Sequence, residues 1–205
     1  MTKVLSVDNS LSKRDITMKR EVAEQLIANM RKPLLYSEDV QENFGYSSAD
    51  VRTLFNRNQI LMSNTPEAGR GVKVQYPMFD VIEIMAYAEL SRLGVRPTFK
   101  GTWKDNKPFA IGIANCIHDV IKGMSGDTRP RLRAIPNSKD VEEVPPGSEP
   151  YVVVYYTKEQ QGIWAEWADK AMKVFESAGD ARVIVDCKAL AERAGEIFLR
   201  YKNRL

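Results

Sequence analysis

Hydrophobic residues recur three or four positions apart along much of the chain, which is the spacing of amphipathic helices. The helices predicted in this way cover residues 13–31, 37–44, 48–58, 77–94, 108–122, 159–177 and 188–202. Shorter stretches favour strands, because 72–76 alternates apolar with polar residues and both 151–156 and 183–185 are rich in Val, Ile or Tyr. The expected fold class is therefore α+β with mostly α structure.

The predicted elements divide the chain into consecutive segments. Residues 1–12 form a flexible tail, and residues 13–32 form an N-terminal helix that ends before a proline. A unit of helices and a hairpin occupies 33–96, and 97–150 holds a helix, a basic loop and a proline-rich linker. Residues 151–205 are expected to form a small α/β C-terminal region with the order β-α-β-α.

The segment 33–96 begins with residues typical of the caps and the turn of two short, consecutive helices. Ser37 and Ser47 each precede a predicted helix, where a hydroxyl can cap the free amides of the first turn. Gly45 supplies the turn between the helices. A polar, glycine-containing stretch then predicts a β-hairpin over 63–76 with its tip near 65–70.

The order helix, turn, helix, hairpin, helix is typical of a winged helix-turn-helix, whose second helix enters the major groove of DNA. Arginine can bind guanine and asparagine can bind adenine from such a helix, and basic wing residues reach phosphates. The helix-cap serines place amide donors where a phosphate can approach. The candidate DNA-binding residues are Ser37, Ser47, Ser48, Arg52, Thr53, Asn56, Arg57, Arg70, Lys73, Gln75 and Tyr76.

The same segment resembles the DNA-binding module of the MerR family. The resemblance rests on Gly45-Tyr46-Ser47, Val51-Arg52, Ile60-Leu61, the wing from Arg70 to Tyr76, and Leu93-Gly94. It implies a winged helix-turn-helix over about 33–96, double-stranded DNA as partner, and transcriptional regulation by a homodimer. Thr53-Leu54-Phe55-Asn56 departs from the family's recognition helix, so no promoter contacts carry over. The family's cobalamin signature and metal-sensing cysteines are absent, so no cofactor is expected.

Overall charge is compatible with DNA binding but does not argue for it. The net charge is +3 and the sequence pI is about 8.8, so a DNA-binding face requires basic residues to be concentrated on one side. Arg129, Arg131 and Arg133 form the densest basic cluster. A solvated loop is the default interpretation of that cluster, and a secondary phosphate contact is the alternative.

Neither an enzyme nor a metal site is expected. The single histidine, His118, has no nucleophile or carboxylate at a spacing that indicates catalysis. Cys116 and Cys187 are isolated from each other in sequence, so buried thiols are favoured over metal ligands or a disulfide. No apolar run reaches the about 18 residues of a membrane span, and the N-terminus lacks the apolar core of a signal peptide. The expected location is cytoplasmic, in association with DNA.

Three functions remain open on these grounds. The first is a sequence-specific transcriptional regulator acting as a homodimer, since dimers gain affinity by binding two half-sites. The second is a DNA-binding protein of phage or plasmid type for partition, excision or packaging. The third is a protein-interaction module that does not bind DNA.

Overall fold

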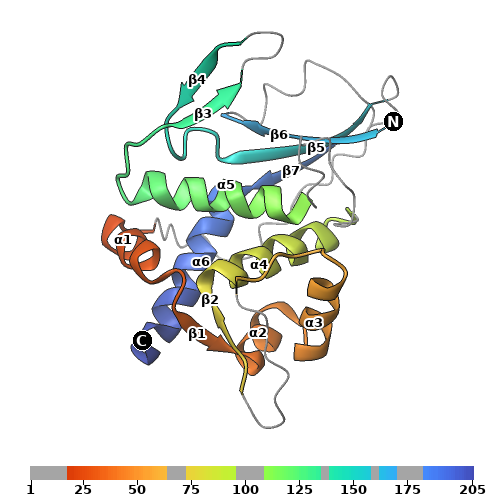
Figure 1. Cartoon of the computed structure of the whole chain (residues 1–205), viewed down its shortest axis with the longest axis vertical. Helices are drawn as coiled ribbons and strands as arrows, with labels where there is room; N and C mark the ends of the chain where they lie inside the picture. Colours follow the sequence, from red (N-terminus) through yellow and green to blue (C-terminus); the bar gives the residue numbers. More distant parts are fainter. Residues whose placement is uncertain (1–17, 64–72, 96–108, 135–138, 158–161, 170–181) are drawn as a thin grey trace.

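The computed structural model describes residues 18–63, 73–95, 109–134, 139–157, 162–169 and 182–205, and it is an α+β structure with small antiparallel sheets (Figure 1). The helices are α1 (Arg20–Asn29), α2 (Ser37–Phe44), α3 (Ser48–Asn56), α4 (Met78–Arg92), α5 (Phe109–Met124) and α6 (Cys187–Tyr201), with the 3₁₀ turn η2 (Lys202–Arg204). The strands are β1 (Pro33–Tyr36), β2 (Gln75–Pro77), β3 (Arg131–Ala134), β4 (Val141–Val144), β5 (Tyr151–Thr157), β6 (Gly162–Ala168) and β7 (Arg182–Asp186).

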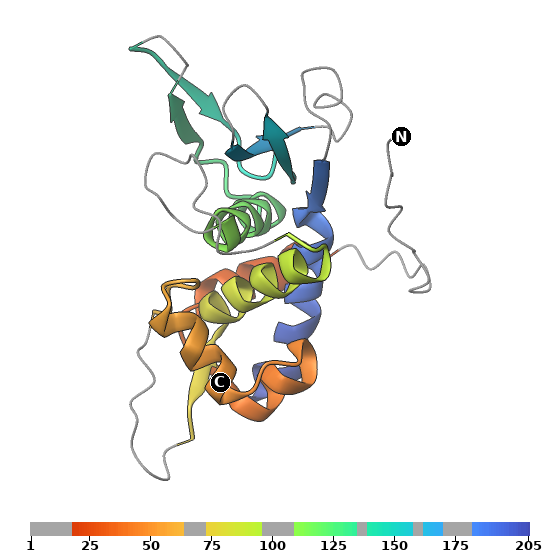
Figure 2. The same ribbon diagram turned by 90° about the vertical axis from the view of Figure 1, so that its right-hand side faces the viewer.

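Helices α4 and α5 form the centre of the molecule. Every residue from 81 to 86 is buried, and α5 buries most of its length. A helix that is apolar on nearly all sides must be covered on nearly all sides, which is why these two pack against each other. Figures 1 and 2 show the three-stranded sheet on one side of this pair and α2, α3, β1 and β2 on the other.

The helix ends follow the caps and breakers of the sequence. The predicted helices 37–44, 48–58, 77–94, 108–122 and 188–202 are all confirmed, with ends displaced by no more than two residues. The N-terminal helix is shorter than predicted and begins at Arg20, while residues 13–17 lie outside the described part of the chain.

Strand β2 pairs with β1, a segment for which the sequence pattern predicted no strand. The pairing is antiparallel, with Tyr36 opposite Gln75 and Leu35 opposite Tyr76. Leu34 and Leu35 of β1 are buried in the core. Their burial stabilises a strand that is too short to be stable through its own hydrogen bonds. Most of the hairpin predicted over 63–76 lies outside the described residues.

The predicted helix 159–177 is wrong where the structure describes it, because residues 162–168 form β6. The sheet order is β6-β5-β7, and all pairings are antiparallel, with Val152 opposite both Trp167 and Val185. The apolar residues of 162–168 fit a helical and a strand spacing about equally, so local pattern does not decide between them. Hydrogen bonding along the whole length of β5 decides in favour of the strand.

The basic loop and proline-rich linker predicted for 129–150 contain a β-hairpin instead. Strands β3 and β4 pair antiparallel, with Arg133 opposite Glu142 and Leu132 opposite Glu143. Basic residues on one strand and acidic residues on the other attract across the pair. That cross-strand attraction was not visible in the composition of either strand alone.

Apart from a small cluster around Val153 and Ala168, the buried residues of the C-terminal region belong to the core shared with the rest of the chain. Asp186 caps α6 by accepting hydrogen bonds from the Lys188 and Ala189 amides at 2.9 and 3.0 Å. The helix then runs across α5, α4 and α1, and its buried residues belong to the same apolar cluster as Leu26, Val51 and Ile84. The described part of 151–205 therefore has the order β-β-β-α and shares the core of 33–96.

Candidate nucleic-acid interface

The turn between α2 and α3 is fixed by backbone geometry and by a cap. Gly45 has φ of 77°, a left-handed conformation that glycine adopts without strain. Ser47 Oγ accepts a hydrogen bond from the Asp50 amide at 3.2 Å, and the Asp50 carboxylate accepts one from the Ser47 amide at 2.9 Å. This reciprocal capping box confirms Ser47 as the cap of α3. Tyr46 packs edge-on against Tyr87 of α4 at 5.9 Å and holds the turn to the core.

Ser37 is the first residue of α2 and not its cap. The Tyr36 amide donates to Asp39 Oδ2 at 2.8 Å, so Asp39 in the first turn makes the hydrogen bond that closes this end of the helix. A carboxylate at this position also interacts favourably with the helix dipole. The acidic first turn of the sequence was the signal for this arrangement.

Helix α3 separates a buried stripe from an exposed polar face. Val51 and Leu54 point into the core, whereas Arg52, Thr53, Asn56 and Arg57 are exposed, as are Ala49 and Asp50 in the first turn. The Thr53 hydroxyl donates to the Ala49 carbonyl at 2.9 Å and is thereby directed along its own helix. Ser48, at the start of α3, is half-buried.

Arg52 and Arg57 differ from the other arginines whose side chains the structure describes. Their side chains form no ion pair, hydrogen bond or ring contact within that part of the chain, although the charge of Arg57 opposes the rise in the pKa of Tyr87 caused by burial. The others each contact a carboxylate, Asn43 or an aromatic ring: Arg20, Arg31, Arg92, Arg129, Arg131, Arg133, Arg193, Arg200 and Arg204. The outward face of α3 thus carries positive charge that the described fold does not neutralise.

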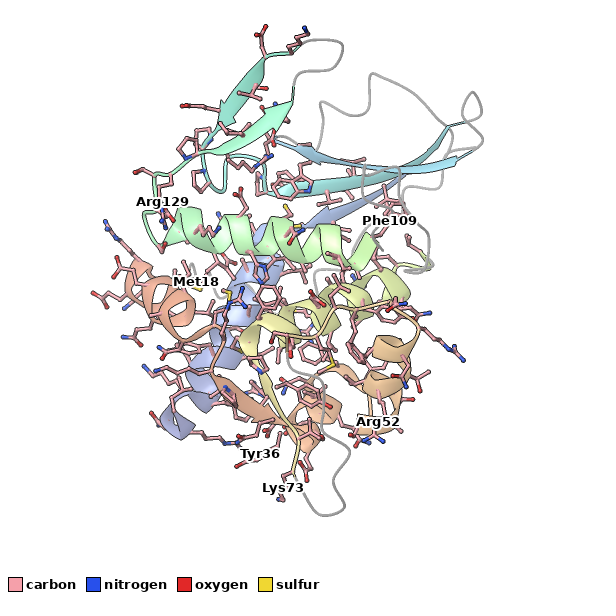
Figure 3. All side chains as sticks on the ribbon, viewed as in Figure 1. Met18, Tyr36, Arg52, Lys73, Phe109 and Arg129 are labelled. Atoms are coloured by element: carbon pink, nitrogen blue, oxygen red, sulfur yellow. The ribbon has the colours of Figure 1, made fainter. Side chains whose placement is uncertain are left out.

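Lys73, Tyr36 and Arg52 lie at the same end of the molecule, the lower end in Figure 3. The Lys73 ammonium is exposed, 5.5 Å from the centre of the Tyr36 ring and 4.0 Å from the Glu38 carboxylate. An ion pair this long and this exposed contributes little. Gln75 is half-buried in β2 next to it, and Arg70 lies outside the described residues.

Tyr76 is a core residue and cannot contact DNA in this fold. It is 1% exposed, and its hydroxyl makes no hydrogen bond within the described residues. Successive residues of a strand face opposite sides, so a half-buried Gln75 is followed by an inward Tyr76. The prediction that Tyr76 belongs to the DNA-binding set is therefore wrong.

Two buried acidic side chains of α4 hold the segment that leaves α3. Glu83 Oε2 accepts a hydrogen bond from the Leu61 amide at 2.5 Å, and Asp80 Oδ1 accepts one from the Ser63 amide at 2.8 Å. Burial raises the pKa of Glu83 to about 8. The hydrogen bond from the Leu61 amide lowers this pKa in part, and the negative charge of Asp80 raises it further. Acidic residues within a strongly apolar helix were the signal that sequence reasoning missed.

The basic cluster Arg129, Arg131 and Arg133 is bound within the fold, away from α3. Arg133 pairs with Glu142 at 2.7 Å and Glu149 at 2.5 Å, and Arg131 pairs with Glu149 and lies 4.2 Å from the Trp167 ring centre. Arg129 pairs with Asp127 at 2.7 Å and holds the pKa of that carboxyl well below its usual value. Figure 3 places Arg129 far from Arg52 and Lys73. A phosphate at this cluster has to compete with the carboxylates already present.

Other titratable groups lie partly or wholly inside the fold. His118 is stacked on Phe79 at 4.8 Å, and burial together with the charges of Lys122 and Arg31 lowers its pKa to about 4. Cys116 and Cys187 are free and buried. Burial is the main cause that raises the pKa of the Cys187 thiol, and its contact with Cys116 raises it further. Within the described ranges, His, Cys, Asp and Glu form no group of three or more that could hold a metal ion.

None of the helices that the structure describes is long and apolar enough to cross a membrane. Comparison of the chain with protein-family models, curated proteins and solved structures finds no match.

Proposed function

We propose that this protein binds double-stranded DNA sequence-specifically through α3 and acts as a transcriptional regulator in the form of a homodimer. The observation that carries the proposal is the pair Arg52 and Arg57, exposed on a helix of a helix–turn–helix arrangement and not neutralised by the described fold. Six of the other described arginines are bound to carboxylates, so leaving these two unpaired favours an external anionic partner.

In this proposal α3 lies in the major groove and Asn56 and the two arginines face base edges. Arginine forms two hydrogen bonds with guanine and asparagine two with adenine, and each such pair is worth about 1–3 kcal/mol of discrimination. Lys73 contacts a phosphate at the side of the groove. The Asp50 amide of α3 already donates to the Ser47 hydroxyl in the capping box, so it is not free to bind a phosphate.

The segment leaving α3 is anchored by a mechanism that suits this role. Because Asp80 and Glu83 fix the Ser63 and Leu61 amides, α3 is held at both ends, by its cap and by α4. Base readout needs side chains that are pre-oriented, since the entropy of ordering them opposes binding. A homodimer doubles the number of contacts by placing two α3 helices in half-sites spaced about 34 Å apart or a multiple of that distance.

The test is selection of duplexes from a random library, followed by titration of the best duplex against the full chain at several salt concentrations. We expect Arg52→Gln and Arg57→Gln to weaken binding by about 1–3 kcal/mol each and to relax the sequence preference. Arg20→Gln is the matched control, because it removes the same charge from an exposed pair with Glu24 on α1.

Two results would count against the proposal. If the wild-type chain selects no duplex, DNA is not its partner. If Arg52→Gln and Arg57→Gln bind as Arg20→Gln does, α3 is not the reading helix, and a protein-interaction role for the same surface gains support. Light scattering of the free and DNA-bound chain gives the number of copies on each duplex.

A further inference from the structure

The last helix of the chain holds both ends of α2 through contacts made more than 140 residues away in sequence. Helix α6 crosses the core and brings its final turns, with η2, beside α2. Figure 1 shows the C-terminus at the same end of the molecule as α2 and β1. The residues that meet there are polar and charged, which distinguishes this contact from the apolar packing of α6 against α4 and α5.

At the C-terminal end of α2, Asn43 is the centre of the contact. Its carbonyl accepts from Arg193 at 3.0 Å, its side-chain oxygen from Arg200 at 3.4 Å, and its side-chain amide donates to the Tyr201 hydroxyl at 3.3 Å. The Arg193 guanidinium also lies 5.4 Å from the Phe44 ring centre. Cations near the last carbonyls of a helix interact favourably with its dipole.

At the N-terminal end of α2, Arg204 forms an ion pair with Asp39, the residue whose carboxylate closes the first turn. Its guanidinium lies 4.6 Å from the ring centre of Tyr201 and 5.3 Å from that of Tyr36. Asp39 is 8% exposed, so removing Arg204 would leave a largely buried carboxylate without its cation.

An eight-residue helix is not stable alone, because nucleation is costly and few hydrogen bonds follow it. The tertiary contacts of α2 therefore decide where it lies, and α3 follows it after a turn of a few residues. We infer that Arg193, Arg200 and Arg204 are positioning residues that hold α2, and through it α3, in the orientation required for binding DNA. This inference rests on the proposed function and adds to it a control exerted by the C-terminal helix.

Positioning and direct phosphate contact give different salt dependence, which makes the inference testable. Loss of a phosphate contact reduces the slope of log K against log salt by about one, whereas loss of a positioning contact lowers affinity with the slope unchanged. If the variant holds a competent α2–α3 arrangement in a tenth to a third of molecules, its apparent Kd rises about three- to tenfold.

The experiment compares Arg204→Gln, Asp39→Asn and the double variant with wild type and Arg20→Gln, using the full chain and the selected duplex. We expect each single variant to raise Kd about three- to tenfold with an unchanged salt slope. The double variant should bind DNA no more weakly than the weaker-binding of the two single variants, because each single variant already removes the ion pair between Arg204 and Asp39. Amide hydrogen exchange without DNA should show faster exchange in α2, with α5 unchanged.

Arg193→Gln is a second, independent variant, acting at the other end of α2, and should give the same pattern. The inference is overturned if Arg204→Gln binds as Arg20→Gln does, if the salt slope falls by about one, or if α2 exchanges no faster than in wild type. Failure of the wild-type chain to bind any duplex is a different result, which refutes the proposed function itself. Urea unfolding of each variant establishes that it is folded before binding is measured.

Discussion

Replacing Glu83 with glutamine should make the protein less sensitive to alkaline pH. The wild-type carboxyl has a pKa of about 8 in the folded state, mainly because it is buried, against an ordinary value of 4.5. Between these two values the folded state retains a proton that the unfolded state has lost, so the free energy of unfolding falls as pH rises. Each pKa unit is worth about 1.4 kcal/mol, so the full rise corresponds to about 5 kcal/mol, most of it reached by pH 8 and the rest above it.

Glutamine keeps an oxygen that can accept the Leu61 hydrogen bond but removes the ionisation. The assay is urea unfolding, followed by circular dichroism, of wild type and Glu83→Gln at pH 5, 6, 7 and 8. We expect the difference in stability between the two proteins to shift by about 4 kcal/mol in favour of the variant between pH 5 and pH 8. Glu24→Gln, at an exposed position on α1, is the control and should show little shift. A Glu83→Gln difference that is constant across this range would refute the reasoning and show that Glu83 is ionised in the folded state.

Three further predictions follow from buried or strained positions. Gly45→Ala should lower the free energy of unfolding by about 1–2 kcal/mol in urea titrations, because alanine is strained at φ of 77°; an unchanged midpoint would contradict the left-handed turn. His118 gives an unambiguous imidazole signal in NMR as the single histidine, and its pKa should be about 4, so stability should decline as pH falls from 6.5 toward 4; a pKa near 6.5 would contradict the burial. The thiols of Cys116 and Cys187 should react with a disulfide reagent at the rate of unfolding, and rapid reaction of the native protein would show that they are accessible.

Helices were predictable in this chain because their ends are marked locally. Gly45, Ser47 and Gly94 lie where helices end or begin, and each marker acts within a few residues. Strands were not equally predictable, since β6 exists because β5 offers it hydrogen bonds and β1 exists because β2 does. The sequence of one segment alone does not indicate which distant segment it will pair with.

The candidate interface also has features that local sequence predicts and features that depend on distant contacts. The outward face of α3 follows from helical periodicity, so Arg52 and Arg57 were predictable as exposed residues. That the described part of the fold brings no carboxylate to them was not predictable, because it depends on how distant segments pack. The inward orientation of Tyr76 depends on the register of β2 against β1. The contact of Arg204 with Asp39 depends on a segment 165 residues away. The local sequence pattern predicts neither of them.

The order of translation gives the contact between α6 and α2 a consequence for newly made protein. Asn43 leaves the ribosome 150 residues before Arg193, and at about 5–20 residues per second this interval lasts roughly 8–30 s. During that time α2 lacks the contacts that hold both of its ends. If the proposed function holds, a polypeptide whose synthesis stops before α6 would carry α3 without this support, and it should bind the DNA site less tightly than the full chain does.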